Sequence, residues 1–146
     1  MCDDRFNIKQ FVIIVLITSI WINVSEVFRF FVFVMPMIQS FWEGRSGVAE
    51  MNFQIFGIWG LWDTLLTSVL VFTVWLFTRV FGDSMKSIVL SSTIVWATVF
   101  VVFWVATANM GLSSWSILQV ALPLSWLEMI VGGWISTKLY QSKRWA

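Results

Sequence analysis

The fold of this chain is decided by its first long apolar run, Phe11–Met35, which reads FVIIVLITSIWINVSEVFRFFVFVM. At about 1.5 Å per helical residue, this run is long enough to cross the roughly 30 Å hydrocarbon core of a bilayer. Within the run, Glu26 and Arg29 stand three residues apart. An ionisable side chain at that depth is costly unless it is paired or hydrated, so such groups face the interior of a helix bundle. The run therefore predicts a membrane-spanning helix with a charged inner face.

Three further apolar runs follow, and the composition of the whole chain supports the same interpretation. Only 12% of the 146 residues are charged, against about 25% in a typical soluble domain. Runs of about 20 apolar residues fit helices rather than the roughly 10-residue strands of a membrane barrel. The sequence therefore predicts one all-α integral membrane domain, residues 1–146, folded as a four-span antiparallel transmembrane helix bundle. The predicted spans are 10–35, 53–78, 88–108 and 116–139.

Positive charges are distributed unequally between the segments that connect these spans. The two chain ends and the second loop hold seven Lys and Arg residues, whereas the first and third loops hold one, Arg45. Because positive charge accumulates on the cytoplasmic side of a membrane, both termini are expected to be cytoplasmic. Asp3 and Asp4 are unlike the positive start of a secretory signal, so the first run is expected to be retained as a span. The short loops and the lack of a targeting segment favour a bacterial inner (plasma) membrane.

The absence of certain residue types excludes several classes of chemistry. The chain has one cysteine, Cys2, and no histidine. A disulfide within the chain is therefore excluded, as are histidine-ligated haem, copper or zinc and histidine proton relays. The sequence has no glycine-rich phosphate loop and no nucleophile beside a base. We therefore expect no catalytic residues, no metal site, no cofactor and no nucleic-acid partner, which disfavours an enzyme without deciding the question.

Proline, serine and glycine residues indicate where the predicted helices begin and end. Pro36 is expected to end or kink the first helix, because proline lacks an N–H and crowds the preceding turn. Ser84 is expected to cap the third helix, and Gly111 is expected to close it with a positive φ. Pro123 falls inside the fourth span, where a neighbouring helix can satisfy the carbonyl that it frees.

Polar side chains recur every three or four residues in three of the spans, as they do along one face of a helix. We therefore predict that the first, second and fourth spans surround a polar interior, and that the third span is more peripheral. The candidate ion-pair or ion-pathway residues are Glu26, Arg29, Asp63 and Glu128. The supporting polar residues are Asn23, Ser19, Thr67 and Ser125.

The charges of the four ionisable candidates do not balance. Arg29 stays protonated and can neutralise one carboxylate, either Glu26 on its own helix or Asp63 across an interface. Counting residues from the cytoplasmic helix ends places Glu128 closest to the cytoplasm and farthest from Arg29. We therefore expect Glu128 to carry a proton at neutral pH, unless a cation or water reaches it.

The sequence also contains eleven tryptophans, eight of them within the predicted spans. We interpret most of them as lipid-facing or packing aromatics, because indole rings suit both positions in a membrane protein. An aromatic cage for an organic cation is the alternative interpretation.

Two functions remain open at this point. The preferred hypothesis is a non-catalytic subunit or accessory factor of a membrane complex, with a Glu/Arg/Asp cluster that fixes helix register or contacts a partner. The alternative is a small proton- or cation-coupled transporter that uses Glu26, Asp63 and Glu128. A cavity that leads to one of these carboxylates would favour the transporter, whereas a closed, dry cluster would favour the subunit. The expected partners are the lipid bilayer and either further copies of the chain or a partner membrane subunit.

Overall fold

The structure is a computed structural model that describes residues 6–45 and 50–142, and every regular element among them is helical. Cys2, Asp3 and Asp4, which entered the sequence interpretation, lie outside the described residues. The elements are α1 (Ile8–Arg29), η1 (Phe30–Val34), α2 (Met35–Trp42), α3 (Phe53–Phe81), α4 (Met85–Trp96), η2 (Ala97–Val101), α5 (Val102–Asn109) and α6 (Trp115–Gln141).

These elements form four continuous helical rods, because η1 joins α1 to α2 and η2 joins α4 to α5 without a break. Each rod is long and apolar enough to cross a membrane. The rods are Ile8–Trp42, Phe53–Phe81, Met85–Asn109 and Trp115–Gln141. The all-helical class and the four membrane-length helices predicted from the sequence are therefore confirmed.

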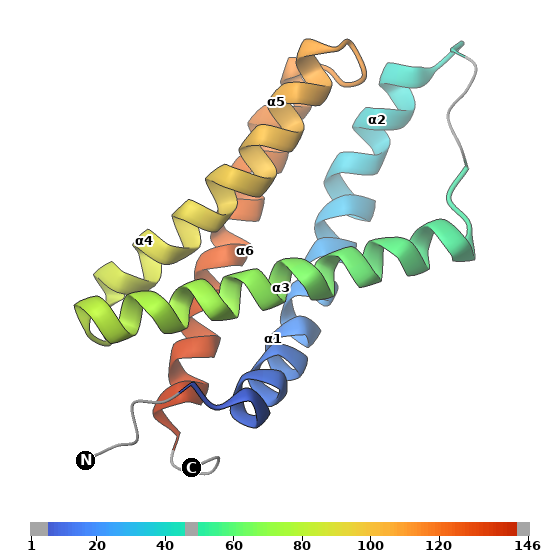
Figure 1. Ribbon diagram of the computed structural model, residues 1–146. Helices are drawn as coiled ribbons and strands as arrows, with labels where there is room; N and C mark the ends of the chain where they lie inside the picture. The colour runs from blue at the N-terminus through green and yellow to red at the C-terminus, as the bar shows by residue number, and fades with distance from the viewer. Residues whose placement is uncertain (1–5, 46–49, 143–146) are drawn as a thin grey trace.

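The start of the first rod and the ends of the second and fourth rods meet at one end of the molecule. Phe6 packs edge-on against Trp75 of α3, with ring centroids 4.9 Å apart. Leu139 and Tyr140, at the end of α6, pack against a small core formed by Ile14 and other residues of α1 and α3. Consecutive rods therefore run in opposite directions. Figure 1 also shows that α3 crosses the other rods obliquely, so that its N-terminal half lies away from α4 and α5.

Two adjacent glycines of α6 allow the four rods to approach closely. A Cβ added at Gly132 would lie 3.0 Å from atoms of both Ile22 on α1 and Leu70 on α3, and one at Gly133 would collide with Ser92 on α4. Small residues at helix interfaces permit such close packing in membranes, where lipid removes most of the hydrophobic drive for association. The lack of side chains at Gly132 and Gly133 therefore lets α1, α3 and α4 pack closely around α6.

The structure corrects two sequence-based expectations about the rods. Pro36 does not end the first helix, which continues to Trp42. The π-helical turn η1 precedes Pro36, with the Met35 N–H bonded to the Phe30 carbonyl, and this wider turn accommodates the missing proline N–H. Nor is the third span peripheral, because α4 packs against both α3 and α6.

Other predicted helix ends are observed. The side chain of Ser84 accepts a hydrogen bond from the backbone N–H of Ser87 at 3.2 Å and so caps α4. Gly111 follows α5 with φ of 72°. Pro123 lies inside α6.

Candidate functional site

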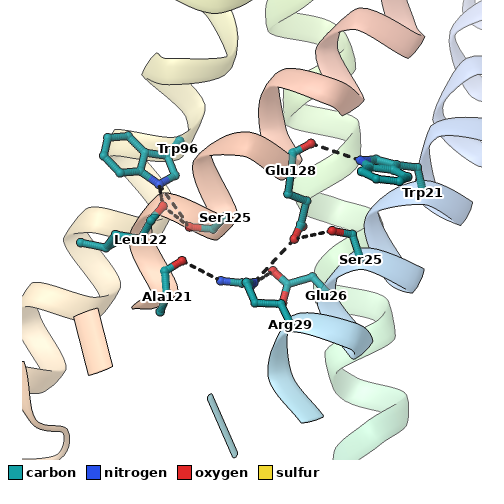
Figure 2. Close-up of polar contacts among 9 residues, drawn as sticks. All are labelled: Trp21, Ser25, Glu26, Arg29, Trp96, Ala121, Leu122, Ser125 and Glu128. Atoms are coloured by element: carbon teal, nitrogen blue, oxygen red, sulfur yellow. Dashed lines mark hydrogen bonds and ion pairs between the residues drawn. The ribbon is translucent and has the colours of Figure 1, made fainter. Parts of the chain in front are cut away.

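Arg29, the last residue of α1, is the centre of a buried polar network (Figure 2). Its side chain forms an ion pair with Glu26, one turn earlier on the same helix. Its Nη1 donates a hydrogen bond to the carbonyl oxygen of Ala121 on α6 at 3.2 Å, and its Nε lies 3.6 Å from Oε2 of Glu128. The guanidinium carbon also lies 5.2 Å from the ring centroid of Phe100 in η2. One cation thus joins the first, third and fourth rods.

Glu128 is buried at the interface between α6 and α1. Its Oε2 accepts a hydrogen bond of 3.0 Å from the hydroxyl of Ser25, and its backbone carbonyl accepts one of 3.2 Å from the indole N–H of Trp21. Its Oε1 is buried and has no hydrogen-bond partner among the described residues. Glu128 and Glu26 therefore both contact the guanidinium of Arg29, and Oε1 of Glu128 remains available for protonation.

Asp63, on α3, is as buried as Arg29 but belongs to no ion pair. The residue is 7% exposed, and its side chain forms neither a hydrogen bond nor an ion pair with any described residue. Its backbone carbonyl accepts a hydrogen bond from the Thr67 hydroxyl at 2.7 Å, which leaves the carboxylate untouched. Asp63 is therefore a carboxylate held in an apolar surrounding without a counter-charge in contact with it.

A cavity of about 550 Å³ lies beside this network. Three of the four ionisable candidates, Glu26, Arg29 and Asp63, line it, whereas Glu128 does not. The remaining wall is mostly apolar and comes from η1, α2, the N-terminal half of α3, η2 and α5. Residues of the N-terminal half of α3 face residues of η2 and α5 across this cavity. Its aromatic lining residues are Phe30, Phe31, Phe56, Trp59, Trp62, Phe100, Phe103 and Trp104.

The four supporting polar residues occupy different positions around this site. Asn23 lines the cavity, and its amide donates to the Ser19 carbonyl at 2.9 Å. The Ser19 hydroxyl is buried without a partner among the described residues. Thr67 bonds to the backbone of Asp63. Ser125 accepts a hydrogen bond of 3.1 Å from the indole N–H of Trp96, which also reaches the Leu122 carbonyl at 2.9 Å (Figure 2).

The structure selects one of the two expected partners of Arg29 and places Glu128 differently from the expectation. Of the two possible partners of Arg29 it pairs Glu26 and not Asp63, and it places Glu128 next to Arg29 rather than farthest from it. The depth count assumed upright helices whose ends are level. Ser25 contacts Glu128 and Thr18 contacts Ser136, so the end of α6 is not level with the start of α1, and equal counts from the two ends do not correspond to equal depths.

Ser25, Trp21 and Phe100 were not anticipated as parts of the network. Ser25 lies four residues before Arg29, and this spacing places both on one helix face, so the signal was present in the sequence. The indole of Trp21 and the ring of Phe100 give no such signal, because their partners are a backbone carbonyl and a guanidinium on other rods.

Comparison with known protein families, with curated proteins and with solved structures finds no match to this chain. Within residues 6–45 and 50–142, no three Asp, Glu or Cys side chains gather closely enough to hold a metal ion.

Proposed function

We propose that this protein is a small multi-pass transporter that couples cation movement to protons through Glu26, Asp63 and Glu128. The single observation that carries the proposal is the cavity of about 550 Å³ that reaches the carboxylates of Glu26 and Asp63. A purely structural charge cluster has no need of such a space. A transporter needs a route by which a cation or proton reaches a buried acid.

The charge balance supports the same proposal. Three carboxylates share one guanidinium, and this guanidinium is already engaged by Glu26, Glu128 and the Ala121 carbonyl. At least one acid must therefore be neutralised by a proton or by a cation that is not part of the chain. If a proton and a cation exchange at the same acids, the movement of the cation is coupled to the movement of protons.

Two π-helical turns border the cavity and could change shape during such exchange. Phe30, Phe31 and Val34 of η1 line the cavity from one side, and Val99 and Phe100 of η2 line it from another. π-Helical turns are rare and frequently occur at functional sites, because the extra residue loosens the regular hydrogen-bond ladder. They would let the ends of the rods move while the glycine-packed region stays in place.

The proposal includes an orientation with both termini in the cytoplasm. It rests on the bias of seven Lys and Arg residues at one side of the predicted spans against one at the other. In this orientation the cavity faces the outer side, because Met51 and Leu112, which line it, adjoin the loops at the end remote from the chain termini.

Proton flux measured in proteoliposomes tests the proposal. Vesicles with a pH-sensitive dye and an acidic interior receive external Na⁺, K⁺ or tetraethylammonium in separate runs. We expect at least one cation to drive proton release with the wild-type protein, and neither Asp63→Asn nor Glu128→Gln to support it. Glu43→Gln, in an exposed loop, is the matched control and should behave as the wild type. Folded wild-type protein that shows no flux above empty vesicles with any of the three cations would overturn the proposal.

A second candidate, an accessory subunit of a membrane complex, is favoured by one specific observation. The N-terminal half of α3 has a run of large apolar residues that are each 44–88% exposed, namely Phe53, Phe56, Ile58, Trp59, Leu61 and Trp62. A partner helix could pack along this half of α3. Co-purification of a stoichiometric partner from native membranes, lost on truncating these side chains, would favour this candidate over the transporter.

A further inference from the structure

We infer that the cavity binds a lipophilic organic monocation, such as a quaternary ammonium or phosphonium ion with aromatic or alkyl substituents, with Asp63 as its counter-charge. This inference rests on the proposed function and names the class of cation that the same site would take.

The first step in the argument is the isolation of Asp63. Asp63 is 7% exposed and lines the cavity, and its carboxylate has no polar partner among the described residues. Arg29 lines the same cavity but is held by Glu26 on its own helix and by Ala121 on α6. Burial of an ionised carboxylate is unfavourable unless an opposite charge accompanies it. A positively charged ligand in the cavity would supply that charge.

The second step is the character of the cavity wall. An inorganic cation needs several oxygen ligands, six to eight for Ca²⁺, at short distances. The wall offers mainly aromatic and aliphatic side chains, with few oxygens besides those of the carboxylates. Aromatic faces attract organic cations, which need no oxygen shell, and the attraction strengthens when the site excludes water. Eight phenylalanine and tryptophan residues line the cavity, so the wall favours an organic over an inorganic cation.

The third step is the volume of the cavity and the sign of the charge that its lining residues favour in a ligand. A volume of about 550 Å³ falls within the roughly 300–1,000 Å³ of small-molecule pockets. An organic anion would face the carboxylates of Glu26 and Asp63 with only Arg29 in its favour, and Arg29 is already paired. A neutral lipid chain would fill the apolar part but leave Asp63 without a counter-charge. Of these three occupants, only the monocation both suits the apolar wall and neutralises an ionised Asp63.

Equilibrium dialysis with two ions of matched shape and opposite charge tests the inference. Purified full-length protein in lipid nanodiscs is titrated with tetraphenylphosphonium and, separately, with tetraphenylborate. We expect saturable binding of tetraphenylphosphonium and none of tetraphenylborate. Asp63→Asn should weaken the binding of tetraphenylphosphonium by about tenfold or more, whereas Asp63→Glu should retain most of it. Asp83→Asn, the same change at an exposed loop position, should bind as the wild type.

If Asp63→Asn does not fold, a comparison of substitutions at two tryptophans, one inside and one outside the cavity, tests the same inference. Trp62 lines the cavity and is 51% exposed, whereas Trp134 is 46% exposed and does not line it. Trp62→Leu should weaken binding several-fold and Trp134→Leu should not. Equal saturable binding of both ions, or equal affinity of the cavity variants and their controls, would overturn the inference.

The results also separate this inference from the proposed function. Binding of tetraphenylphosphonium without any proton-coupled flux would refute the transporter and leave the ligand class intact. Flux driven by Na⁺ or K⁺ without binding of tetraphenylphosphonium would refute the ligand class alone.

Discussion

The Nε of Arg29 at the end of α1 lies 3.6 Å from Oε2 of Glu128 in α6, although most of the chain separates the two residues in sequence. The same guanidinium is paired with Glu26 and donates to the Ala121 carbonyl. One positive charge therefore stands between two carboxylates on two helices. This arrangement ties the end of α1 to the middle of α6, next to the cavity.

Replacing Arg29 should destabilise the protein strongly. Arg29→Leu leaves the partly buried carboxylate of Glu26 without its counter-charge, and breaking a buried pair in this way costs about 3–5 kcal/mol. Thermal unfolding in detergent measures the loss. Lys86→Leu, which removes a positive charge at an exposed position, is the control. Equal melting temperatures for Arg29→Leu and the wild type would show that the network contributes no stability.

The hydrogen bond from Ser25 to Glu128 should contribute measurably to the packing of α1 on α6. Ser25→Ala removes the donor and leaves the buried Oε2 dependent on Arg29 alone, so we expect a loss of about 1–3 kcal/mol. Denaturation in mixed detergent micelles gives the difference in the free energy of unfolding. Ser40→Ala, at an exposed position on α2, should change this free energy very little. A similar loss in both variants would contradict the assignment.

Glu128 should be protonated at neutral pH, because Arg29 cannot neutralise Glu26 and Glu128 together. Infrared spectroscopy of the wild type should show a protonated carboxyl band that disappears in Glu128→Gln and persists in Glu43→Gln, which changes an exposed carboxyl. The Glu128→Gln variant should fold with nearly wild-type stability, since it replaces one neutral group by another. Ionisation of Glu128 well below neutral pH would contradict the charge balance on which the proposed function depends.

The close approach of α6 to α4 should depend on Gly133. In Gly133→Ala the new methyl group meets the Ser92 hydroxyl and also lies 3.4 Å from Cγ2 of Ile88, so Ser92 must change rotamer or the rods must separate, at a cost of about 1–3 kcal/mol. Gly57→Ala, where nothing lies within 4 Å of the added Cβ, should be neutral or stabilising, since alanine favours the helix. Thermal unfolding of the two variants in one detergent compares them, and equal stability would show that this contact is not tight.

The proposed orientation predicts which loops are accessible from outside the cell. In a Cys2→Ser background, Leu112→Cys lies in the loop after α5 and Asp83→Cys in the loop after α3. A membrane-impermeant maleimide should label Leu112→Cys in intact cells and Asp83→Cys only after the membrane is opened. The reverse pattern would place both termini outside.

How far the sequence predicts the site differs from residue to residue. Glu26, Arg29, Asp63 and Glu128 are recognisable because each is an ionisable residue inside an apolar run, and the cost of burying charge acts on each residue separately. Which carboxylate Arg29 contacts cannot be predicted from the sequence in the same way. It depends on how far each helix rotates and tilts, and no local pattern reports those quantities.

By itself the sequence determined four helices of membrane length and the identity of the acids and the base that they bury, because apolar length and charge are properties of single segments. Only the tertiary structure decided that Arg29 joins Glu26 to Glu128 and that Asp63 stands alone beside a cavity. The physical reason is the packing of the rods on Gly132 and Gly133 together with the oblique course of α3. These features carry the N-terminal half of α3 away from α4 and α5, and a mostly apolar cavity lies beside the unpaired carboxylate of Asp63.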